Sequence, residues 1–349
     1  MGVEHHETRA YSPGRVNLIG DHTDYNEGLA LPMAVDLGTT VAFTPDASRR
    51  VVLFSAEEPE PADVDLHVRF DVELLQAFEP RWARYVAAMV AMVRPRRGGR
   101  GTVDTTLPVG AGLSSSASLE VALALALGFE AEPVTIATTC QRAEQAATGV
   151  ASGLMDQLVV SQATEGCALL VDFSDLSARH VHVPEQLEVV VVHCGERRTL
   201  DHSPYMARRA ECEAAAFGLG PLGHVSPDDL VGISDALLRR RARHVVTECD
   251  RVRWCASALE SGDLKEAGRL MTASHRSLAQ DFEVSTRALD DLVEHLLCMP
   301  GVFGARLTGA GFGGCVVALT ELGAVDLTAL RTPAWRVRPS TGAHLLSGA

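Results

Sequence analysis

A short segment near the N-terminus gathers side chains that can do chemistry. Residues 12–26 contain Arg15, Asp21, His22 and Asp24, along with a tyrosine and two glycines. A core strand would not carry so many polar groups, and a solvated loop would not enclose the apolar residues at positions 16, 18 and 19. The segment therefore indicates a binding site for a small ligand that is phosphorylated or rich in hydroxyl groups.

A second segment, residues 108–118, has the composition of a loop that binds phosphate. A strand predicted over residues 102–107 leads into glycines and three consecutive serines, and a helix predicted over residues 119–129 follows. Glycines let the backbone approach an anion, and the N–H groups at a helix start donate to it. A glycine turn that leads into a serine-capped helix accounts for the same residues equally well.

Two later segments carry fewer polar groups but similar turn residues. Asp156 follows two glycines in an apolar neighbourhood, which is typical of a buried cap or of a functional carboxylate with an arginine partner. Residues 309–314 form a glycine loop inside a strand–turn–strand pattern predicted over residues 302–320. Such a loop is usually a tight bend, although it can also close over a ligand.

The composition limits the possible partners and the possible chemistry. The net charge of −14 argues against nucleic acid or an anionic membrane, since either favours a basic protein surface. Only one of the 31 basic residues is a lysine, Lys265, and it lies at a predicted helix start. Walker-type nucleotidases and protein kinases place a lysine on phosphate, so both classes are disfavoured.

The cysteine pattern and the hydropathy indicate the cellular compartment. None of the eight cysteines forms a Cys-x-x-Cys motif, which favours reduced, buried thiols over disulfides or zinc ligands. The sequence shows neither a basic-then-apolar signal segment nor an apolar run of about 20 residues that could span a membrane. We therefore expect a soluble, cytoplasmic protein.

The secondary-structure pattern changes near residues 175–195, from mixed strands and helices to mainly helices. We therefore expect two domains, over residues 1–180 and 181–349. Residues 17–19 are expected to belong to the strand that holds the polar groups of the first segment. The other predicted elements are strands within residues 29–54 and over 187–194, helices over 81–93 and 135–148, a basic turn at 94–101, and helices within 205–297 with breaks near 218–227 and at 262.

In order and spacing, the four segments resemble those of the galactokinases, a family within the GHMP small-molecule kinases. Residues 15–26 are similar to the galactokinase signature, and residues 108–117 to the motif that binds the phosphates of ATP. Residues 155–157 are similar to the catalytic segment, and residues 309–314 to the third motif of the superfamily. The likeness extends from about residue 10 to about residue 320.

The resemblance implies an α+β fold with two domains. The family combines an N-terminal ribosomal-protein-S5-domain-2-like domain with a C-terminal ferredoxin-like domain, and its active site lies in the cleft between them. Its phosphate loop works through backbone amides, hydroxyl groups and Mg²⁺. That arrangement suits a chain with a single lysine.

The implied reaction is the ATP-dependent phosphorylation of the anomeric hydroxyl of galactose to galactose 1-phosphate, a step of the Leloir pathway of galactose metabolism. Asp156 is the expected acceptor of the hydroxyl proton. Arg15 is expected to pair with Asp156 and with the phosphoryl group in transfer. Because phosphoryl transfer has a loose transition state, Asp156 can also act mainly as an orienting acceptor.

The same resemblance assigns the residues that bind the sugar. Asp24 is expected to accept hydrogen bonds from two adjacent ring hydroxyls, while Asp21 and His22 meet the C6 end. The remaining face of the sugar is assigned to Gly153, Asp156 and Tyr205.

The resemblance also assigns the residues that bind ATP and Mg²⁺. Ser116 and Glu144 are the expected Mg²⁺ ligands, although a helix residue such as Glu144 can also be structural. Trp82 and Tyr85 are similar to adenine-side residues, but their helical spacing also permits core packing. The residues expected around the phosphates are Gly110, Ala111, Gly112, Leu113, Ser114, Ser115 and Ser116.

One position departs from the family pattern. Galactokinases usually carry glutamate where this chain has Asp21, and the shorter side chain leaves room for a water or for a different substituent at C6. Relaxed specificity at C6 is the corresponding hypothesis.

Three classes of function remain open at this point. The first is a galactokinase, with galactose and ATP as its partners and with neither nucleic acid nor a membrane. The second is a GHMP kinase for another galacto-configured sugar, such as L-arabinose or N-acetylgalactosamine. The third is a non-catalytic galactose sensor. The known sensor that is related to galactokinase lacks a Ser-Ala pair in the phosphate motif, whereas this pair is intact here at Ser116-Ala117. The expected assembly is a monomer or a weak homodimer.

Overall fold

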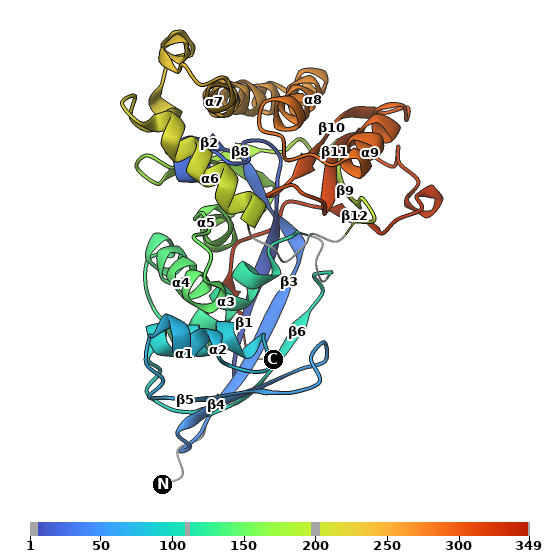
Figure 1. Ribbon diagram of the computed structural model, residues 1–349. Coiled ribbons are helices and arrows are strands. Elements are labelled where there is room, and N and C mark those ends of the chain that lie inside the picture. The colour runs from blue at the N-terminus through green and yellow to red at the C-terminus, as the bar shows by residue number, and fades with distance from the viewer. Residues whose placement is uncertain (1–5, 109–111, 197–202, 348–349) are drawn as a thin grey trace.

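Two groups of helices and strands lie at opposite ends of an elongated molecule (Figure 1). The structure is a computed structural model, which describes residues 6–108, 112–196 and 203–347. In the view of Figure 1, helices α1–α5 lie in the lower group, and α6–α9 lie in the upper group with strands β9–β12. Strands β1 and β3 extend from the lower group toward the upper one.

The lower group is built on a six-stranded sheet with the strand order β13-β1-β3-β6-β4-β5. All its neighbouring strands are antiparallel except β4 and β6, which are parallel. Its strands are β1 (Thr8–Asn17), β3 (Pro32–Pro45), β4 (Arg50–Ser55), β5 (Ala62–Asp65), β6 (Gly99–Thr105) and β13 (His344–Leu345). Its helices are α1 (Val72–Gln76), α2 (Ala83–Val93), α3 (Ser115–Ala126), α4 (Pro133–Thr148) and α5 (Met155–Gln162).

The core of the lower group lies between the sheet and these helices. Apolar side chains such as Val41 and Leu53 on the strands pack against Val86 and Leu123 on the helices, and all four are fully buried. Burial of this kind contributes about 25 cal/mol per Å² of apolar surface, which makes it the main term that holds the helices on the sheet.

A small sheet joins the two groups. It has the strand order β2-β7-β8 and consists of β2 (Leu29–Ala30), β7 (Cys167–Asp172) and β8 (Ser177–His182). Helix α7 (Ala236–Ser261) packs against β2 and β8. The segment that precedes β2 is therefore held between the lower sheet and the helices of the upper group.

The upper group is built on a four-stranded antiparallel sheet with the strand order β10-β11-β9-β12. Its strands are β9 (Leu187–His193), β10 (Val302–Thr308), β11 (Cys315–Glu321) and β12 (Ala334–Val337). Its helices are α6 (Ser203–Ala216), α7, α8 (Leu264–Gln280) and α9 (Arg287–Leu297), with short 3₁₀ turns at Asp24–Asn26, Leu222–His224, Pro227–Gly232 and Leu327–Ala329.

Two glycines let α8 lie directly on β10. A Cβ atom on Gly304 would lie 2.0 Å from the carbonyl oxygen of Gly268, and a Cβ on Gly268 would lie 2.2 Å from the carbonyl oxygen of Phe303. Larger residues at either position would push the helix off the strand. Strand β10 is therefore closely fixed against α8. Lys265 lies exposed in the first turn of α8.

The tail of the chain returns to the lower sheet. β13 pairs with β1, with Leu345 opposite Ala10, and Pro339 forms an isolated bridge with Val35. The boundary expected between residues 180 and 181 falls inside β8. The division into residues 1–180 and 181–349 stays a proposal, and the tail packs with the first part in space.

The predicted α+β class is confirmed, and most of the expected elements occur. The helices predicted over residues 81–93, 119–129 and 135–148 correspond to α2, α3 and α4, and the broken helical region corresponds to α6–α9. Helix α7 begins after the Asp235 cap, whose carboxylate accepts from two backbone N–H groups, and it ends at Gly262 with φ of 75°.

Two expectations differ in detail from the structure. Residues 18 and 19 lie beyond β1, which ends at Asn17, because the chain turns at Gly20 with φ of 97°. The basic turn is shorter than expected, since β6 already begins at Gly99. Within the described residues no cysteine forms a disulfide, and no helix is long and apolar enough to cross a membrane.

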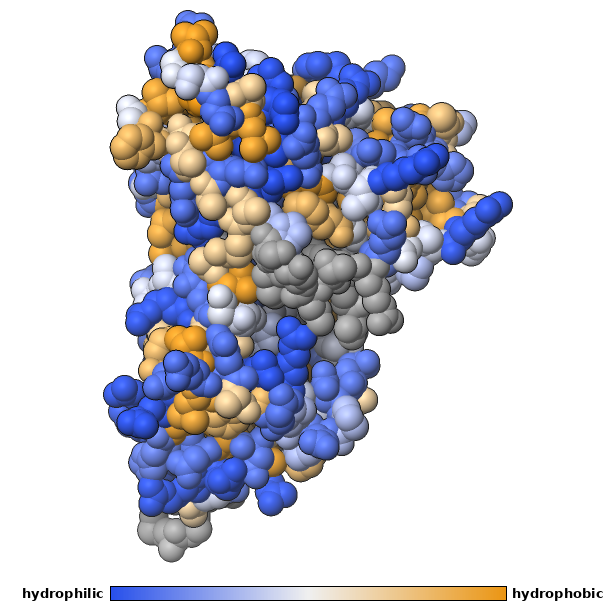
Figure 2. All heavy atoms as spheres, in the orientation of Figure 1, coloured by the Kyte–Doolittle hydropathy of each residue, from blue (hydrophilic) through white to orange (hydrophobic). Residues whose placement is uncertain are grey.

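Most of the visible surface is hydrophilic, as the net charge suggests (Figure 2). Hydrophobic residues gather at the upper left of that view. The apolar side chains with large exposed fractions include Phe217 at 92% and Val231 at 81%, both in the region between α6 and α7.

Candidate active site

Arg15 and Asp156 form a bidentate ion pair. The Nε of Arg15 donates to Oδ1 of Asp156 and its Nη2 donates to Oδ2, each at 2.8 Å. The Nη1 of Arg15 donates to the carbonyl oxygen of Gly112 at 2.7 Å, and its backbone N–H donates to the carbonyl oxygen of Leu113 at 3.1 Å. The predicted pair is thus formed, and it is tied to the end of the phosphate-loop segment.

Asp156 lies where a substrate can reach it. It stands in the first turn of α5, where the helix dipole favours a negative charge. Its Oδ2 also accepts from the hydroxyl of Ser114 at 2.5 Å. The side chain of Asp156 is 29% exposed while that of Arg15 is 9% exposed, so the carboxylate is the accessible member of the pair.

The start of α3 brings the predicted Mg²⁺ residues together. The hydroxyl of Ser116 donates to Oε1 of Glu144 at 2.7 Å, and the hydroxyl of Ser152 donates to Oε2 at 2.9 Å. A hydroxyl and a carboxylate are oxygen ligands that suit Mg²⁺, which commonly takes few protein ligands and completes its shell with waters and phosphates. No cluster of three metal-ligating side chains occurs in the described part of the chain.

Gln157 supports Glu144 and also bonds to a second carboxylate, that of Glu120. The amide Nε2 of Gln157 donates to Glu144 at 3.0 Å and to the buried Glu120 at 3.2 Å. Burial raises the pKa of Glu120 well above its usual range, and the charge of Glu144 adds to the shift. The residue next to Asp156 was visible in the sequence as part of the catalytic segment, whereas Glu120 looked like any helix residue.

Asp24 and Gly153 lie against each other. A Cβ atom on Gly153 would lie 1.5 Å from Oδ2 of Asp24, so this contact requires glycine. Burial raises the pKa of Asp24 to about 6, and the nearby charge of Asp156 adds to the shift. The two carboxylates that the sequence assigned to different ends of the sugar site thus lie close enough to influence each other.

An aromatic wall flanks these groups. Nδ1 of His22 and the hydroxyl of Tyr25 are 2.8 Å apart, and the His22 ring packs against Phe282 at a tilt of 39°, with centroids 4.7 Å apart. Tyr205, from α6, meets the Tyr25 ring edge-on at 5.8 Å and lies 5.9 Å from His22. Burial raises the pKa of the Tyr205 phenol well above its usual range, so the phenol keeps its proton and can donate a hydrogen bond.

Arg209, on α6, contacts both the segment before α5 and the ring of Tyr25. Its Nη1 donates to the carbonyl oxygen of Ala151 at 2.7 Å, and its guanidinium carbon lies 5.5 Å from the centre of the Tyr25 ring.

The carboxylate of Asp21 points into the protein. Its Oδ2 pairs with Nη2 of Arg306, and its Oδ1 accepts from the backbone N–H of Gly309 at 2.9 Å. Asp21 is 3% exposed and Arg306 is fully buried. Within the sugar-signature segment, Asp21 therefore has both of its carboxylate oxygens bonded to protein groups from the upper part of the molecule.

The predicted ATP residues fall into two sets. Ser114, Ser115 and Ser116 lie at the start of α3, next to Gly112 and Leu113, whereas Gly110 and Ala111 lie outside the described residues. Trp82 is 8% exposed, packs in the core of the lower group and donates through its indole N–H to the carbonyl oxygen of Glu60 at 3.0 Å. Tyr85 packs at the edge of the same core, so core packing is the contact that the structure supports for both.

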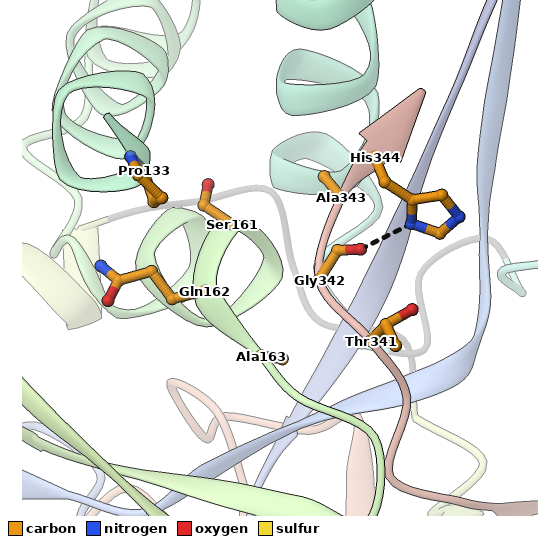
Figure 3. A pocket seen from close by; sticks show the side chains of 8 residues that line it. All are labelled: Pro133, Ser161, Gln162, Ala163, Thr341, Gly342, Ala343 and His344. Atoms are coloured by element: carbon orange, nitrogen blue, oxygen red, sulfur yellow. Dashed lines mark hydrogen bonds between the residues drawn. The ribbon is translucent and has the colours of Figure 1, made fainter. Parts of the chain in front are cut away.

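A hollow of about 570 Å³ lies away from these groups (Figure 3). It is lined by the start of α4, the end of α5 and the tail before β13, and His344 bonds there to the carbonyl oxygen of Gly342 at 2.9 Å. Asp156 lies at the opposite end of α5. The hollow is therefore separate from the cluster around Arg15.

Three family models match the chain in consecutive stretches. The galactokinase galactose-binding signature matches residues 2–45. The GHMP kinases N-terminal domain matches residues 84–163, and the GHMP kinases C-terminal model matches residues 255–330. The first two stretches contain Arg15 and Asp156, and the third contains Arg306.

Several characterised relatives are similar over most of the chain. Human galactokinase is 41% identical over 332 residues, which cover 91% of this chain and 85% of the human one. The galactokinase of Chloroflexus aurantiacus is 40% identical and covers 92% of this chain, with 86% of its own length matched.

Solved structures show the same arrangement of the chain. A Lactococcus lactis galactokinase complexed with galactose superposes with a TM-score of 0.89 and is 29% identical, over 97% of this chain and 95% of that one. A mevalonate kinase superposes with a TM-score of 0.66 at 20% identity, over 95% of this chain and 98% of that one, which shows the shared fold alone.

Proposed function

The chain belongs to the galactokinase family of the GHMP kinases, and from that premise we propose that it transfers the γ-phosphoryl group of ATP to the anomeric hydroxyl of galactose. The products are galactose 1-phosphate and ADP. The observation that carries this proposal is the bidentate pair of Arg15 and Asp156, which lies between the start of α3 and the sugar-signature segment.

Asp156 acts on the sugar hydroxyl, and Arg15 acts on the phosphoryl group. The exposed edge of Asp156 accepts a hydrogen bond from the anomeric hydroxyl and orients its oxygen toward the γ-phosphorus. The new bond joins that oxygen to phosphorus, the bond from phosphorus to the β,γ-bridging oxygen breaks, and ADP leaves. The hydroxyl proton goes to Asp156 and then to solvent. Arg15 offsets the negative charge on the transferring oxygens, as its planar fork suits a phosphoryl group.

Ser116 and Glu144 are the residues that would hold Mg²⁺, and Ser152 and Gln157 hold the Glu144 carboxylate in place. A bound Mg²⁺ would screen the phosphate charges of ATP. The backbone N–H groups at the start of α3 then cradle the phosphates without a lysine.

The sugar would bind over Gly153, between Asp24 and the aromatic wall. Asp24 can accept hydrogen bonds from two adjacent hydroxyls with its two oxygens, and the absence of a side chain at Gly153 leaves room for that carboxylate. Tyr205 and His22 supply polar edges on an apolar surface, which is a common construction for sugar sites.

A coupled ADP-release assay with a sugar panel tests this proposal. We expect turnover with galactose in the presence of ATP and Mg²⁺, and little with glucose, whose O4 is equatorial. Turnover only with L-arabinose or N-acetylgalactosamine would reassign the substrate. Binding of galactose without ADP release would indicate a sensor instead of an enzyme.

The expected cytoplasmic location and the expected monomer or weak homodimer stay predictions. Size-exclusion chromatography with light scattering checks the second of these directly.

A further inference from the structure

We propose that Arg306 is a positioning residue for the sugar-signature loop, residues 17–24, and that Asp21 acts through Arg306 as a brace and does not bind the C6 group of the sugar. The part about C6 rests on the proposed function. The part about the brace concerns the fold of the loop and is independent of the substrate.

Arg306 bonds to the loop at three points. Its Nη1 donates to the carbonyl oxygens of Asn17 and Leu18, each at 3.2 Å, and its Nη2 pairs with the carboxylate of Asp21. The Arg306 side chain is fully buried and that of Asp21 is 4% exposed. A buried arginine without its acceptors would be very costly, so the loop and the side chain fix each other.

The second oxygen of Asp21 is bonded as well. Oδ1 accepts from the backbone N–H of Gly309, which opens the glycine loop after β10. The backbone carbonyl of Asp21 lies 3.1 Å from Nε2 of the buried His244 on α7. Asp21 is thus bonded on its side chain and on its backbone by residues of the upper group, and both of its carboxylate oxygens have protein partners.

Other contacts hold the same loop on the same support. The hydroxyl of Thr308 donates to the carbonyl oxygen of Asn17 at 3.0 Å, and the Asn17 N–H donates back to it at 3.2 Å. The N–H of Gly20 donates to the buried Glu248 on α7 at 3.1 Å. Burial alone would raise the pKa of Glu248, but Arg251, together with His244, Arg306 and Ser274, lowers the pKa to about 2.

The support itself is rigid because α8 lies on β10 through Gly268 and Gly304. Arg306 therefore holds the segment that contains His22 and Asp24 in a fixed position relative to β10. In this arrangement the length of the acidic side chain at position 21 sets the distance between the loop and β10. It does not set the size of the sugar pocket at C6.

Two variants and two controls test the brace. In Arg306→Lys the charge remains, but a single ammonium cannot bond to three acceptors arranged around a guanidinium. Asp21→Asn keeps the shape and removes the charge. Arg336→Lys is the matched control for the substitution, since Arg336 lies on β12, at the opposite edge of the same sheet, and bonds there to Glu188 at 3.0 Å. Leu319→Ala, at a fully buried position of β11, is the control for lost stability.

The kinetic readout separates positioning from general damage. We expect Arg306→Lys to raise KM for galactose by about ten- to a hundredfold while kcat changes less than about threefold, because the loop binds sugar and Asp156 performs the transfer. Both controls should keep KM near the wild-type value at a temperature where they are folded. An equal rise of KM in Leu319→Ala would overturn the assignment.

Selectivity at C6 separates a brace from a ligand. We measure kcat/KM for galactose and for 6-deoxygalactose in wild type, Asp21→Asn and Asp21→Glu. A brace leaves the ratio of the two values unchanged within about twofold, even where both values fall. A shift of the ratio by about tenfold or more toward 6-deoxygalactose would show that Asp21 contacts the O6 hydroxyl.

Amide hydrogen exchange tests the brace without any substrate. Residues 17–24 should exchange at least about tenfold faster in Arg306→Lys than in wild type, and at the wild-type rate in Arg336→Lys. If Arg306→Lys does not fold, Asp21→Asn carries the same measurement. Unchanged exchange would refute the brace, whereas a wild type that releases no ADP with galactose would refute only the proposed function.

Discussion

Two arginine–aspartate pairs each take one member from the N-terminal segment, Arg15 in the first and Asp21 in the second, and they differ in exposure. The side chains of Arg15 and Asp156 are 9% and 29% exposed, whereas those of Arg306 and Asp21 are 0% and 4% exposed. The first pair leaves an edge for a substrate, and the second leaves none. The same chemical pair can thus hold a reacting group or hold a loop, and access to solvent decides which.

The partners of the two pairs agree with this difference. The first pair connects to Gly112 and Ser114, at the start of the helix where phosphates are expected. The second pair connects to the backbone carbonyls of residues 17 and 18 and to the backbone N–H of Gly309. Loss of the first pair should therefore affect turnover, and loss of the second should affect placement.

The largest expected effect comes from Asp156→Asn at the exposed pair. We expect kcat to fall by about a thousandfold or more, since the variant loses both the negative charge and the group that takes the proton of the anomeric hydroxyl. Galactose binding and the melting temperature should change little. ADP-release kinetics and calorimetric titration with galactose measure the two quantities.

Wild-type-like turnover in this variant would remove Asp156 from the reaction. Loss of folding, seen as a lost melting transition, would instead show that the exposed pair is needed for the stability of the fold, as the buried pair is. Either result would erase the contrast between the pairs.

A smaller effect is expected at Gly153, which lies against Asp24. In Gly153→Ala the new methyl group would meet Oδ2 of Asp24 at 1.5 Å, so either the carboxylate or the loop must move. We expect KM for galactose to rise by about ten- to a hundredfold with kcat within about fivefold. Steady-state kinetics check this split. A fall in kcat with unchanged KM would place Gly153 with the transfer centre instead of the sugar pocket.

Because Asp24 must be ionised to accept, we expect an acidic limb in the pH profile, over which kcat/KM rises about tenfold per pH unit. The Asp24 pKa of about 6 lies above the unfolded value of 3.8, so the ionised acceptor forms as the pH rises through 6. The value of kcat/KM should rise from pH 5 to pH 6 and level off near pH 7. Asp24→Asn should show no such limb, and a limb that persists in this variant would assign it to another group.

The raised pKa of Asp24 has the opposite effect on the stability of the fold, which decreases as the pH rises. A raised carboxyl pKa favours the protonated form in the folded state, and the stability that this form contributes is lost as the pH rises from about 4 through 6. We therefore expect Asp24→Asn to melt at a higher temperature than wild type at pH 7.5.

The smallest effect is expected at a third, solvent-exposed pair. Arg179 on β8 bonds to Glu260 on α7, and their side chains are 53% and 40% exposed. Arg179→Ala should change the free energy of unfolding by less than about 1 kcal/mol and leave KM unchanged. Denaturant titration checks this. A larger loss would mean that exposure is a poor guide to the role of such pairs in this fold.

Sequence reasoning predicted the pair of Arg15 and Asp156 because both residues lie in short motifs, and their roles in the transfer stay predictions. Arg15, Ser116 and Asp156 each occur beside turn glycines, and the structure brings each of them to a predicted neighbour. Trp82 was ambiguous because helical spacing fits both an adenine contact and core packing.

The brace was not predictable from the sequence. Asp21 and Arg306 are separated by 285 positions, and nothing in either motif marks the other as its partner. The polar residues of α7 that face the loop, His244 and Glu248, stand among other charged residues on a long helix. Burial of such groups depends on tertiary packing, and periodicity alone does not report it.

The exposed position of Lys265 has a consequence for chemical probing. Reagents that acylate lysine beside a bound nucleotide detect many ATP-using enzymes, but the single lysine of this chain lies in the first turn of α8. Such probes would pass over this protein in a proteome-wide survey even when its nucleotide site is full. The same amine offers one side-chain position for a fluorophore or a surface tether that leaves Asp156 untouched.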